Sequence, residues 1–98
     1  MDEQYTLNGI TFEWERSKAS ANQRKHRITF ELACEAFFDP FVYHWDKQVI
    51  DGENRETIIG MTANWRYLFV VYVMREETVR LVSARLATKS ERERYENQ

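Results

Sequence analysis

The sequence has few of the residues that bend, break or crosslink a chain. Its 98 residues include three glycines, one proline and one cysteine, which excludes long flexible linkers and a disulfide framework. No stretch approaches the roughly 18 apolar residues that a membrane span needs. The N-terminal residues MDEQYTLNG have neither the basic nor the apolar region of a secretory signal. We therefore expect one soluble cytoplasmic domain over residues 1–98, with no membrane partner.

Charged side chains are unevenly distributed along a chain whose formal net charge is only −2. Residues 16–27 carry five lysines and arginines and no acid, whereas residues 28–57 carry seven acids against two cations. A segregated pattern of this kind can present a cationic face to an anionic partner while the total charge stays near zero. The cluster Arg24-Lys25-His26-Arg27 is the first candidate for such a face.

Turn signals and apolar periodicity predict the elements of the first half. Asn8-Gly9 favours a two-residue hairpin turn, and residues 10–14 alternate like a strand with one buried side. Residues 15–26 contain no Gly, Pro or β-branched residue and predict a surface helix. Thr29 can cap a second helix over residues 30–38.

The second half is mainly β-structure. Strands are predicted over residues 41–50, 55–62, 67–74 and 78–87. A capping box of Ser90 and Glu93, or a cap at Thr88, begins a terminal helix over residues 90–98. Strands gathered after two helices indicate a small single α+β domain with an antiparallel sheet, two helices in the N-terminal half and one C-terminal helix.

One side of the first predicted helix carries side chains suited to anionic oxygens. Counted from Trp14 with helical periodicity, Lys18, Asn22 and Lys25 share that side, and His26 lies one step round. Phosphate is the obvious ligand for such a surface. Ordinary solvation of an exposed helix accounts for the same residues equally well on periodicity alone.

Arg85 strengthens the phosphate hypothesis. The residues that alternate with it in the predicted strand are Val79, Leu81 and Ser83. Alternation would therefore place a guanidinium on the apolar side, either leaving the sheet at a rim or held by acceptors in a cleft. Phosphodiester cleavage uses such donors, because charge builds on the nonbridging oxygens. Arg55 and Arg80 are weaker candidates, and pairing with an acid across the sheet accounts better for Arg80.

No metal site and no cofactor are expected. Cys34, His26 and His44 lack the spacing of metal ligands, and the chain has no glycine-rich phosphate loop. No Ser/His/Asp arrangement is visible from spacing either. Cys34 fits a small buried hydrophobe on the second predicted helix.

The chain resembles the BrnT family, the toxin component of BrnT/BrnA-type type II toxin–antitoxin systems, from Phe12 to Glu96. The matching residues are Phe12-Glu13-Trp14-Glu15, Lys18, Asn22, Lys25-His26, Phe30, Ala33, Asp39-Pro40, Arg55, Gly60, Leu68-Phe69-Val70-Val71-Tyr72, Ser83-Ala84-Arg85, Ala87-Thr88, Glu91-Arg92 and Tyr95-Glu96. Two positions depart from the family pattern. Glu15 stands where Asp is common, and Arg27 where a Gly often ends the helix.

The resemblance implies a RelE-like endoribonuclease toxin that inhibits translation and growth. Such toxins resemble metal-independent nucleases that use the RNA's own 2′-hydroxyl as nucleophile. The resemblance also implies neutralisation by a BrnA-like antitoxin in a hetero-oligomer, with operator DNA bound only through that antitoxin. The cationic cluster would then form one wall of an RNA-cleaving site.

We expect His26 to transfer the proton in such a site, because histidine is the side chain that normally changes charge near neutral pH. Lys25 and Arg85 would stabilise the phosphorane charge. The residues expected to position the RNA are Lys18, Asn22, Arg55 and, more weakly, Arg80. Lys25 as the acid or base, with His26 as scaffold, is the nearest alternative.

A non-catalytic module that binds RNA or an acidic protein through the same face is the competing function. No helix-turn-helix pattern supports a DNA-binding regulator acting alone.

Overall fold

The computed structural model describes residues 1–98 and contains a sheet of seven strands with three α-helices. The first hairpin pairs β1 (Asp2–Leu7) with β2 (Ile10–Glu15), and Leu7 lies opposite Ile10. Between them Asn8 and Gly9 have φ values of 49° and 82°. The predicted two-residue turn is confirmed, since both of its residues adopt positive φ.

The remaining strands complete the sheet in the order β1-β2-β7-β6-β5-β3, with β4 paired to β5. Their bounds are β3 (Tyr43–His44), β4 (Gln48–Ile50), β5 (Glu53–Met61), β6 (Tyr67–Arg75) and β7 (Thr78–Leu86). The single strand predicted over residues 41–50 is therefore two short ones. The wholly antiparallel sheet was also wrong, because β2 pairs with β7 in parallel. The two strands are joined through the helices and most of the chain, so no hairpin dictates their direction.

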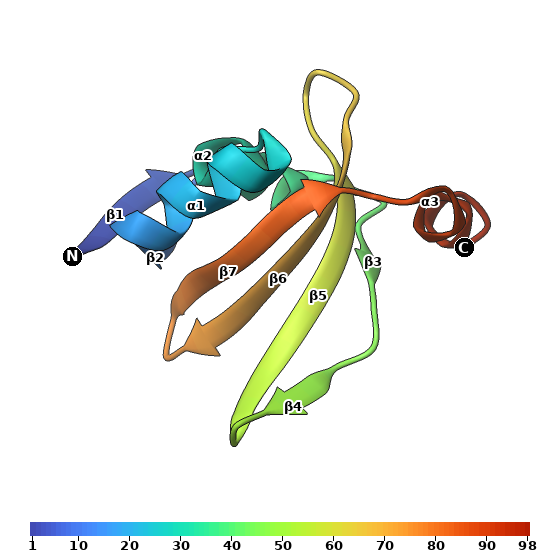
Figure 1. Ribbon diagram of the computed structural model, residues 1–98. Coiled ribbons are helices and arrows are strands. Elements are labelled where there is room, and N and C mark those ends of the chain that lie inside the picture. The colour runs from blue at the N-terminus through green and yellow to red at the C-terminus, as the bar shows by residue number, and fades with distance from the viewer.

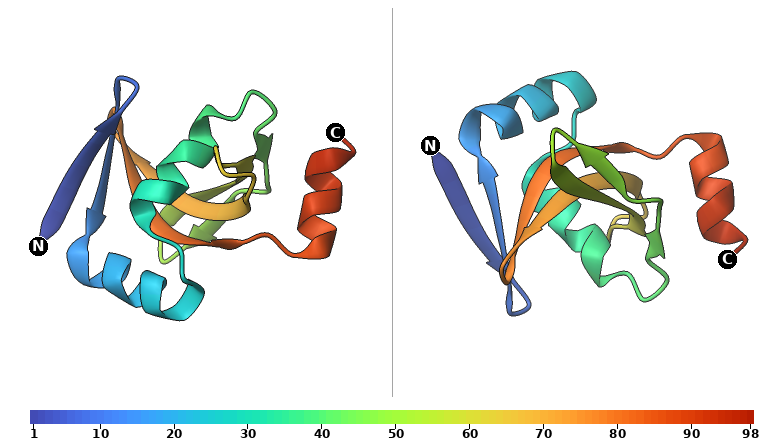
Figure 2. Two further views of the ribbon diagram at one scale, coloured as in Figure 1. Left: turned by 90° about the horizontal axis from the view of Figure 1, so that it is seen from above. Right: turned by 90° about the horizontal axis from the view of Figure 1, so that it is seen from below.

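The helices are α1 (Arg16–His26), α2 (Phe30–Glu35), a 3-10 turn η1 (Ala36–Phe38) and α3 (Lys89–Glu96). The cap at Thr29 is confirmed, but the helix predicted over residues 30–38 tightens into η1 after Glu35. None of the helices is long and apolar enough to cross a membrane. Figures 1 and 2 show α1 near α2, α2 over one face of the sheet, and α3 at the opposite end of the molecule from α1.

The capping residues of α1 and α3 differ in part from the predicted ones. Glu15, placed inside the predicted helix, is the N-cap of α1. Arg27 ends α1 in the left-handed conformation, with a φ of 61°, so the turn keeps the geometry that glycine would adopt easily. In α3 the predicted alternative cap at Thr88 is confirmed, and its capping box is formed with Glu91, two residues before the arrangement predicted with Ser90 and Glu93.

The hydrophobic core lies between α2, η1 and one side of the sheet. Its strand residues include Phe12, Trp14, Ile58, Leu68, Val70, Tyr72, Val79, Leu81 and Ala84, and its helical residues include Phe30, Ala33, Cys34 and Ala36. Gly60 allows η1 to approach β5 closely, because a Cβ there would collide with the Ala36 carbonyl. We call the opposite side of β5, β6 and β7 the far face.

A β-bulge decides which residues of β7 reach the far face. Tyr72 of β6 lies opposite Leu81, but the preceding Val71 lies opposite Ser83, so Val82 is an extra residue in β7. The extra residue shifts the alternation, and Ala84 rather than Ser83 joins the core. The prediction that Val79, Leu81, Ser83 and Arg85 share one side was therefore wrong. Arg85 lies on the far face.

Asn22 attaches α1 to the edge of β7. Strand β2 pairs with β7 only at Val79 and Arg80, so the later part of β7 has no strand on that side. The Asn22 amide takes this place: its nitrogen donates to the Ala84 carbonyl at 2.8 Å, and its oxygen accepts from the Ala84 N–H at 3.1 Å. The same nitrogen donates to the Ile28 carbonyl at 3.0 Å. Asn22 is only 7% exposed, so these bonds are shielded from water.

We predict that Asn22→Ala lowers the free energy of unfolding by about 2–3 kcal/mol, because buried backbone groups of Ala84 and Ile28 lose their partner. Urea unfolding followed by circular dichroism measures the change. Gln23→Ala, an exposed change on the same helix, is the control and is expected to stay within about 0.5 kcal/mol of the original protein. Equal stability of the two variants would contradict the structural role of Asn22.

Candidate functional site at the edge of β7

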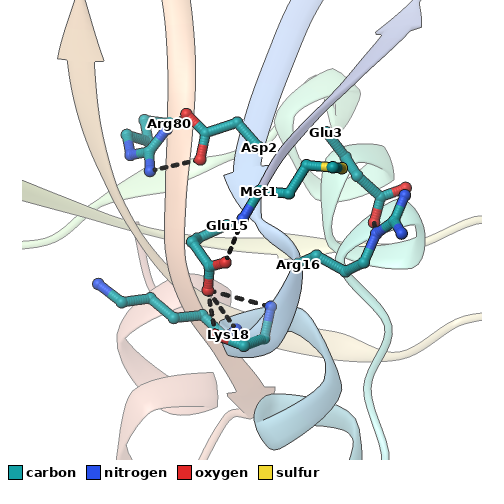
Figure 3. Close-up of polar contacts among 8 residues, drawn as sticks. Met1, Asp2, Glu3, Glu15, Arg16, Lys18 and Arg80 are labelled. Atoms are coloured by element: carbon teal, nitrogen blue, oxygen red, sulfur yellow. Dashed lines mark hydrogen bonds and ion pairs between the residues drawn. The ribbon is translucent and has the colours of Figure 1, made fainter.

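The bond between Asn22 and Ala84 determines how α1 presents its cations. Ala19 packs against the core, and on a helix Lys18 and Lys25 lie on the other side of Asn22 from Ala19. Lys18 and Lys25 are therefore turned toward the far face of the sheet, and both are exposed. Figure 3 shows Lys18 extending to the same side of β2 as Arg80. His26 is half-buried and lies on the Ala19 side of Asn22.

Arg85 is held in place by a carboxylate from α3. Its two terminal nitrogens donate to the two oxygens of Glu91 at 2.8 and 2.9 Å, and one of them also donates to the Leu86 carbonyl. The guanidinium lies 4.1 Å from the centre of the Phe69 ring. This fork-to-fork geometry fixes the plane of the guanidinium. Arg85 is about one third exposed and keeps further N–H groups for a ligand.

Glu91 is almost completely buried beside that guanidinium. Burial alone opposes ionisation of the carboxyl, but hydrogen bonds from Arg85 and from the Thr88 backbone outweigh it and lower the pKa of Glu91. The Glu91 carboxylate thus both completes the capping box of α3 and orients Arg85. Sequence spacing predicted neither role of Glu91, because it placed the capping box two residues later.

Arg55 and Arg80 also lie on the far face by strand alternation, but their surroundings differ. Arg80 forms ion pairs with Glu13 on the neighbouring strand and with Asp2, so its expected pairing across the sheet is confirmed. The Nε of Arg55 is buried without a hydrogen-bond partner, since the Glu53 carboxylate is 3.6 Å away. The unbonded Nε is itself buried, so a ligand could reach Arg55 only through the exposed part of its side chain.

A network of ion pairs fixes the start of α1 against the first hairpin (Figure 3). Glu15 accepts hydrogen bonds from the Ser17 hydroxyl, the terminal amine of Met1 and the Lys18 backbone, which lower the pKa of its carboxyl to about 2. Arg16 pairs with Glu3 on β1. The Glu that replaces the family's common Asp is thus able to cap the helix.

Aromatic residues that the sequence analysis did not single out border Arg85. Trp45 packs edge-to-face on both Phe69 and Tyr43, with ring centres 5.9 and 6.0 Å apart. Arg94 of α3 lies 4.7 Å from the centre of the Trp45 ring and donates to the Tyr43 hydroxyl at 2.9 Å. The sequence signal for this cluster is the alternation of Phe41, Tyr43 and Trp45, which contributed only to the strand predicted over residues 41–50.

The predicted site residues are thus brought together in part. Lys18, Lys25 and Arg85 border one edge of the sheet, whereas Asn22 is buried as a structural link. No hydrogen bond or ion pair joins Lys25 or His26 to Arg85. No three His, Cys, Asp or Glu side chains form a group that could hold a metal ion.

The fold and this site define a small α+β domain with a cationic edge and an adjoining aromatic surface. Residues 14–91 match the family described as the ribonuclease toxin, BrnT, of type II toxin–antitoxin systems. The chain belongs to this family, for which RNA is the target and an antitoxin is the partner. Comparison with curated proteins found no match.

We predict that Glu91→Gln lowers the free energy of unfolding at pH 7 by about 2 kcal/mol, because the charge-assisted bonds to Arg85 are lost. The pKa of Glu91 is lower in the folded chain than in the unfolded chain, so its stabilisation is present above pH 4.5 and disappears as the pH falls further. The variant should lack this part of the acid sensitivity. Urea unfolding between pH 3 and pH 7 tests it, with the exposed Glu93→Gln as control.

Proposed function

We propose that this chain is an endoribonuclease that cleaves RNA without a metal ion, through attack by the RNA's own 2′-hydroxyl. We also propose that its fold is related to that of the RelE toxins. Membership of a ribonuclease toxin family supports the first proposal, and a mainly antiparallel sheet with α2 and η1 packed on one side supports the second.

The observation that carries the proposal is the attachment of Asn22 to Ala84. Strand β2 leads into α1, and Figures 1 and 2 show the helix running along β7 in the direction of that strand. From Asn22 to Lys25 the helix advances by three residues, about 4.5 Å along its axis, and from Ala84 to Arg85 the strand advances by one residue, about 3.3 Å. This geometry supports a position of Lys25 beside the part of β7 that carries Arg85. A phosphodiester at this edge would meet cations from both elements.

The proposed reaction needs two proton transfers and stabilisation of added negative charge. The 2′-oxygen bonds to phosphorus and loses its proton, while the bond from phosphorus to the 5′-oxygen breaks and that oxygen gains a proton. The products are a 2′,3′-cyclic phosphate and a free 5′-hydroxyl. Lys25 and Arg85 stabilise the phosphorane, because cations held in fixed positions need little rearrangement as the charge develops.

We assign proton transfer to His26, which lies at the end of α1 on the other side of Asn22 from Lys25, and backbone positioning to Lys18 and Arg55. Arg80 is the weakest contributor, since two carboxylates already pair with it. Asn22 acts through α1 rather than through RNA, because both of its N–H groups are bonded to carbonyls. Proton transfer by Lys25, with His26 as scaffold, is the competing assignment.

We predict that Arg85→Ala lowers the rate of RNA cleavage in EDTA about a hundredfold or more, because one fixed donor to the developing charge is lost. Cleavage of a labelled single-stranded RNA measures the rate. Arg66→Ala, which removes an exposed cation from the loop between β5 and β6, is the matched control and should keep the original rate.

The same assay separates the competing assignments. Loss of cleavage in His26→Ala supports His26 as the proton-transfer group, whereas full activity in His26→Ala with none in Lys25→Ala contradicts it. RNA retention without cleavage by the unaltered protein would support the non-catalytic binding module instead. Cleavage that Arg85→Ala leaves unchanged would point to a contaminating nuclease.

We further propose that the partner is a BrnA-like antitoxin and that the chain reaches operator DNA only through it. An acidic or aromatic segment of that antitoxin would cover the cationic edge formed by Lys18, Lys25 and Arg85. The arrangement of exposed lysines beside a partly exposed guanidinium supports this complementarity.

We predict that the complex with the antitoxin protects RNA and dissociates more readily as the salt concentration rises, because exposed charge pairs are screened. Titration of the labelled antitoxin at several ionic strengths measures this dependence. Lys18→Ala combined with Lys25→Ala should reduce the slope, and the exposed Arg66→Ala should not. Salt-independent affinity would place the interface on an apolar surface elsewhere.

A further inference from the structure

A hollow of about 570 Å³ lies between α3 and β3, on the side of Arg94 and Trp45. Its lining residues are Tyr43, Trp45, Ser90, Glu93, Arg94, Asn97 and Gln98. Two aromatic rings thus face a guanidinium, two amides, a hydroxyl and a carboxylate. The polar edge of a nucleobase is recognised by such donors and acceptors, while its flat face stacks on aromatic and guanidinium planes.

Phe69 connects this hollow to Arg85. The Arg85 guanidinium lies 4.1 Å from the Phe69 ring centre, and the Trp45 ring centre lies 5.9 Å from the Phe69 ring centre. A phosphate bound at Arg85 would therefore have the aromatic wall of the hollow beside it. Trp45 is only partly buried, and the Arg94 guanidinium lies over its ring, 4.7 Å from the ring centre.

The position of α3 keeps the hollow in shape. Tyr95 donates to Asp39, and Tyr67 donates to Glu96 at 3.0 Å, so two hydroxyls tie the helix to the rest of the molecule. Together with the Arg85–Glu91 pair, these bonds hold α3 at both of its ends. The wall of the hollow that α3 supplies is thus built before any ligand arrives.

We propose that this hollow is a subsite for one nucleobase of single-stranded RNA, stacked against Trp45 and contacted by Arg94. This inference rests on the proposed function, because it places the base next to a phosphate at Arg85. The subsite would select unpaired RNA, since a base within a duplex cannot turn into the hollow.

Binding of abasic oligonucleotides tests the subsite. The probe is a short single-stranded RNA, 2′-O-methylated throughout so that no hydroxyl can attack, with an abasic residue introduced at each position in turn. We predict that one abasic position weakens binding to the unaltered protein about tenfold. Fluorescence anisotropy of the labelled probe measures the affinity.

Variants then connect the missing base to the hollow. In Trp45→Ala the same abasic residue should cause no further loss, and in Trp45→Phe it should still weaken binding. Arg94→Gln should reduce the abasic effect without removing the Trp45 ring. Trp65→Ala is the matched control, because Trp65 is an exposed aromatic that lines a different hollow with Leu7 and Phe38. Thermal unfolding verifies that each variant folds.

The outcomes separate the subsite from the proposed function. An equal abasic effect in the unaltered protein and in Trp45→Ala, or no sensitive position at all, overturns the subsite even if RNA is cleaved. Loss of antitoxin binding in Trp45→Ala with unchanged RNA binding also overturns it, because the hollow would then bind protein. Absence of both RNA cleavage and RNA binding in the unaltered protein contradicts the proposed function as well.

Discussion

The placement of α1 depends on one buried amide. Strand β2 stops pairing with β7 after Arg80, which leaves the next part of β7 without a neighbouring strand. Asn22 bonds there to the N–H and the carbonyl of Ala84, as a strand would. An open edge at this point could pair with another chain, so the amide also protects β7. The helix is thereby held with its lysines beside the far face, and the proposed RNA site is a consequence of this contact.

The two sides of the sheet differ in composition and role. The side that packs on α2 and η1 is closed by aliphatic and aromatic residues, and aromatic contacts such as Trp14 with Phe30 link the strands to the helices. The far face instead carries three arginines that differ in how closely they are paired with acids. Arg80 is paired with two acids, Arg85 is oriented by one through two hydrogen bonds, and Arg55 lies 3.6 Å from the Glu53 carboxylate without a hydrogen bond. This gradation distinguishes structural cations from those available to an anion.

Local signals predicted the elements well, since turns and caps depend on a few neighbouring residues. Asn8-Gly9 and Thr29 do what their chemistry favours, and the long strands lie within a few residues of their predicted bounds. The failures involve residues far apart in sequence. No local pattern shows that β2 will lie beside β7, or that Asn22 will meet Ala84. Helical periodicity grouped Asn22 with the surface lysines. In the sequence, an asparagine that bonds to a strand edge cannot be told from an exposed polar residue.

Candidate site residues were predictable by type but not by partner. The prediction identified Arg85 as a guanidinium near the end of a strand, yet the acceptor that holds it, Glu91, comes from the following helix. Tyr43 and Trp45 were visible as alternating aromatics, but their meeting with Arg94 depends on where α3 returns to the sheet.

The bulge at Val82, rather than residue identity alone, gives the far face its last arginine. If β7 alternated regularly through Val82 without the bulge, Arg85 would exchange sides with Ala84. A charged group would then point into the aliphatic interior, and the outer surface would gain only a methyl group. Within this architecture, one local irregularity of the backbone therefore decides which side chain occupies the anion-binding position, while the residues of the strand stay the same.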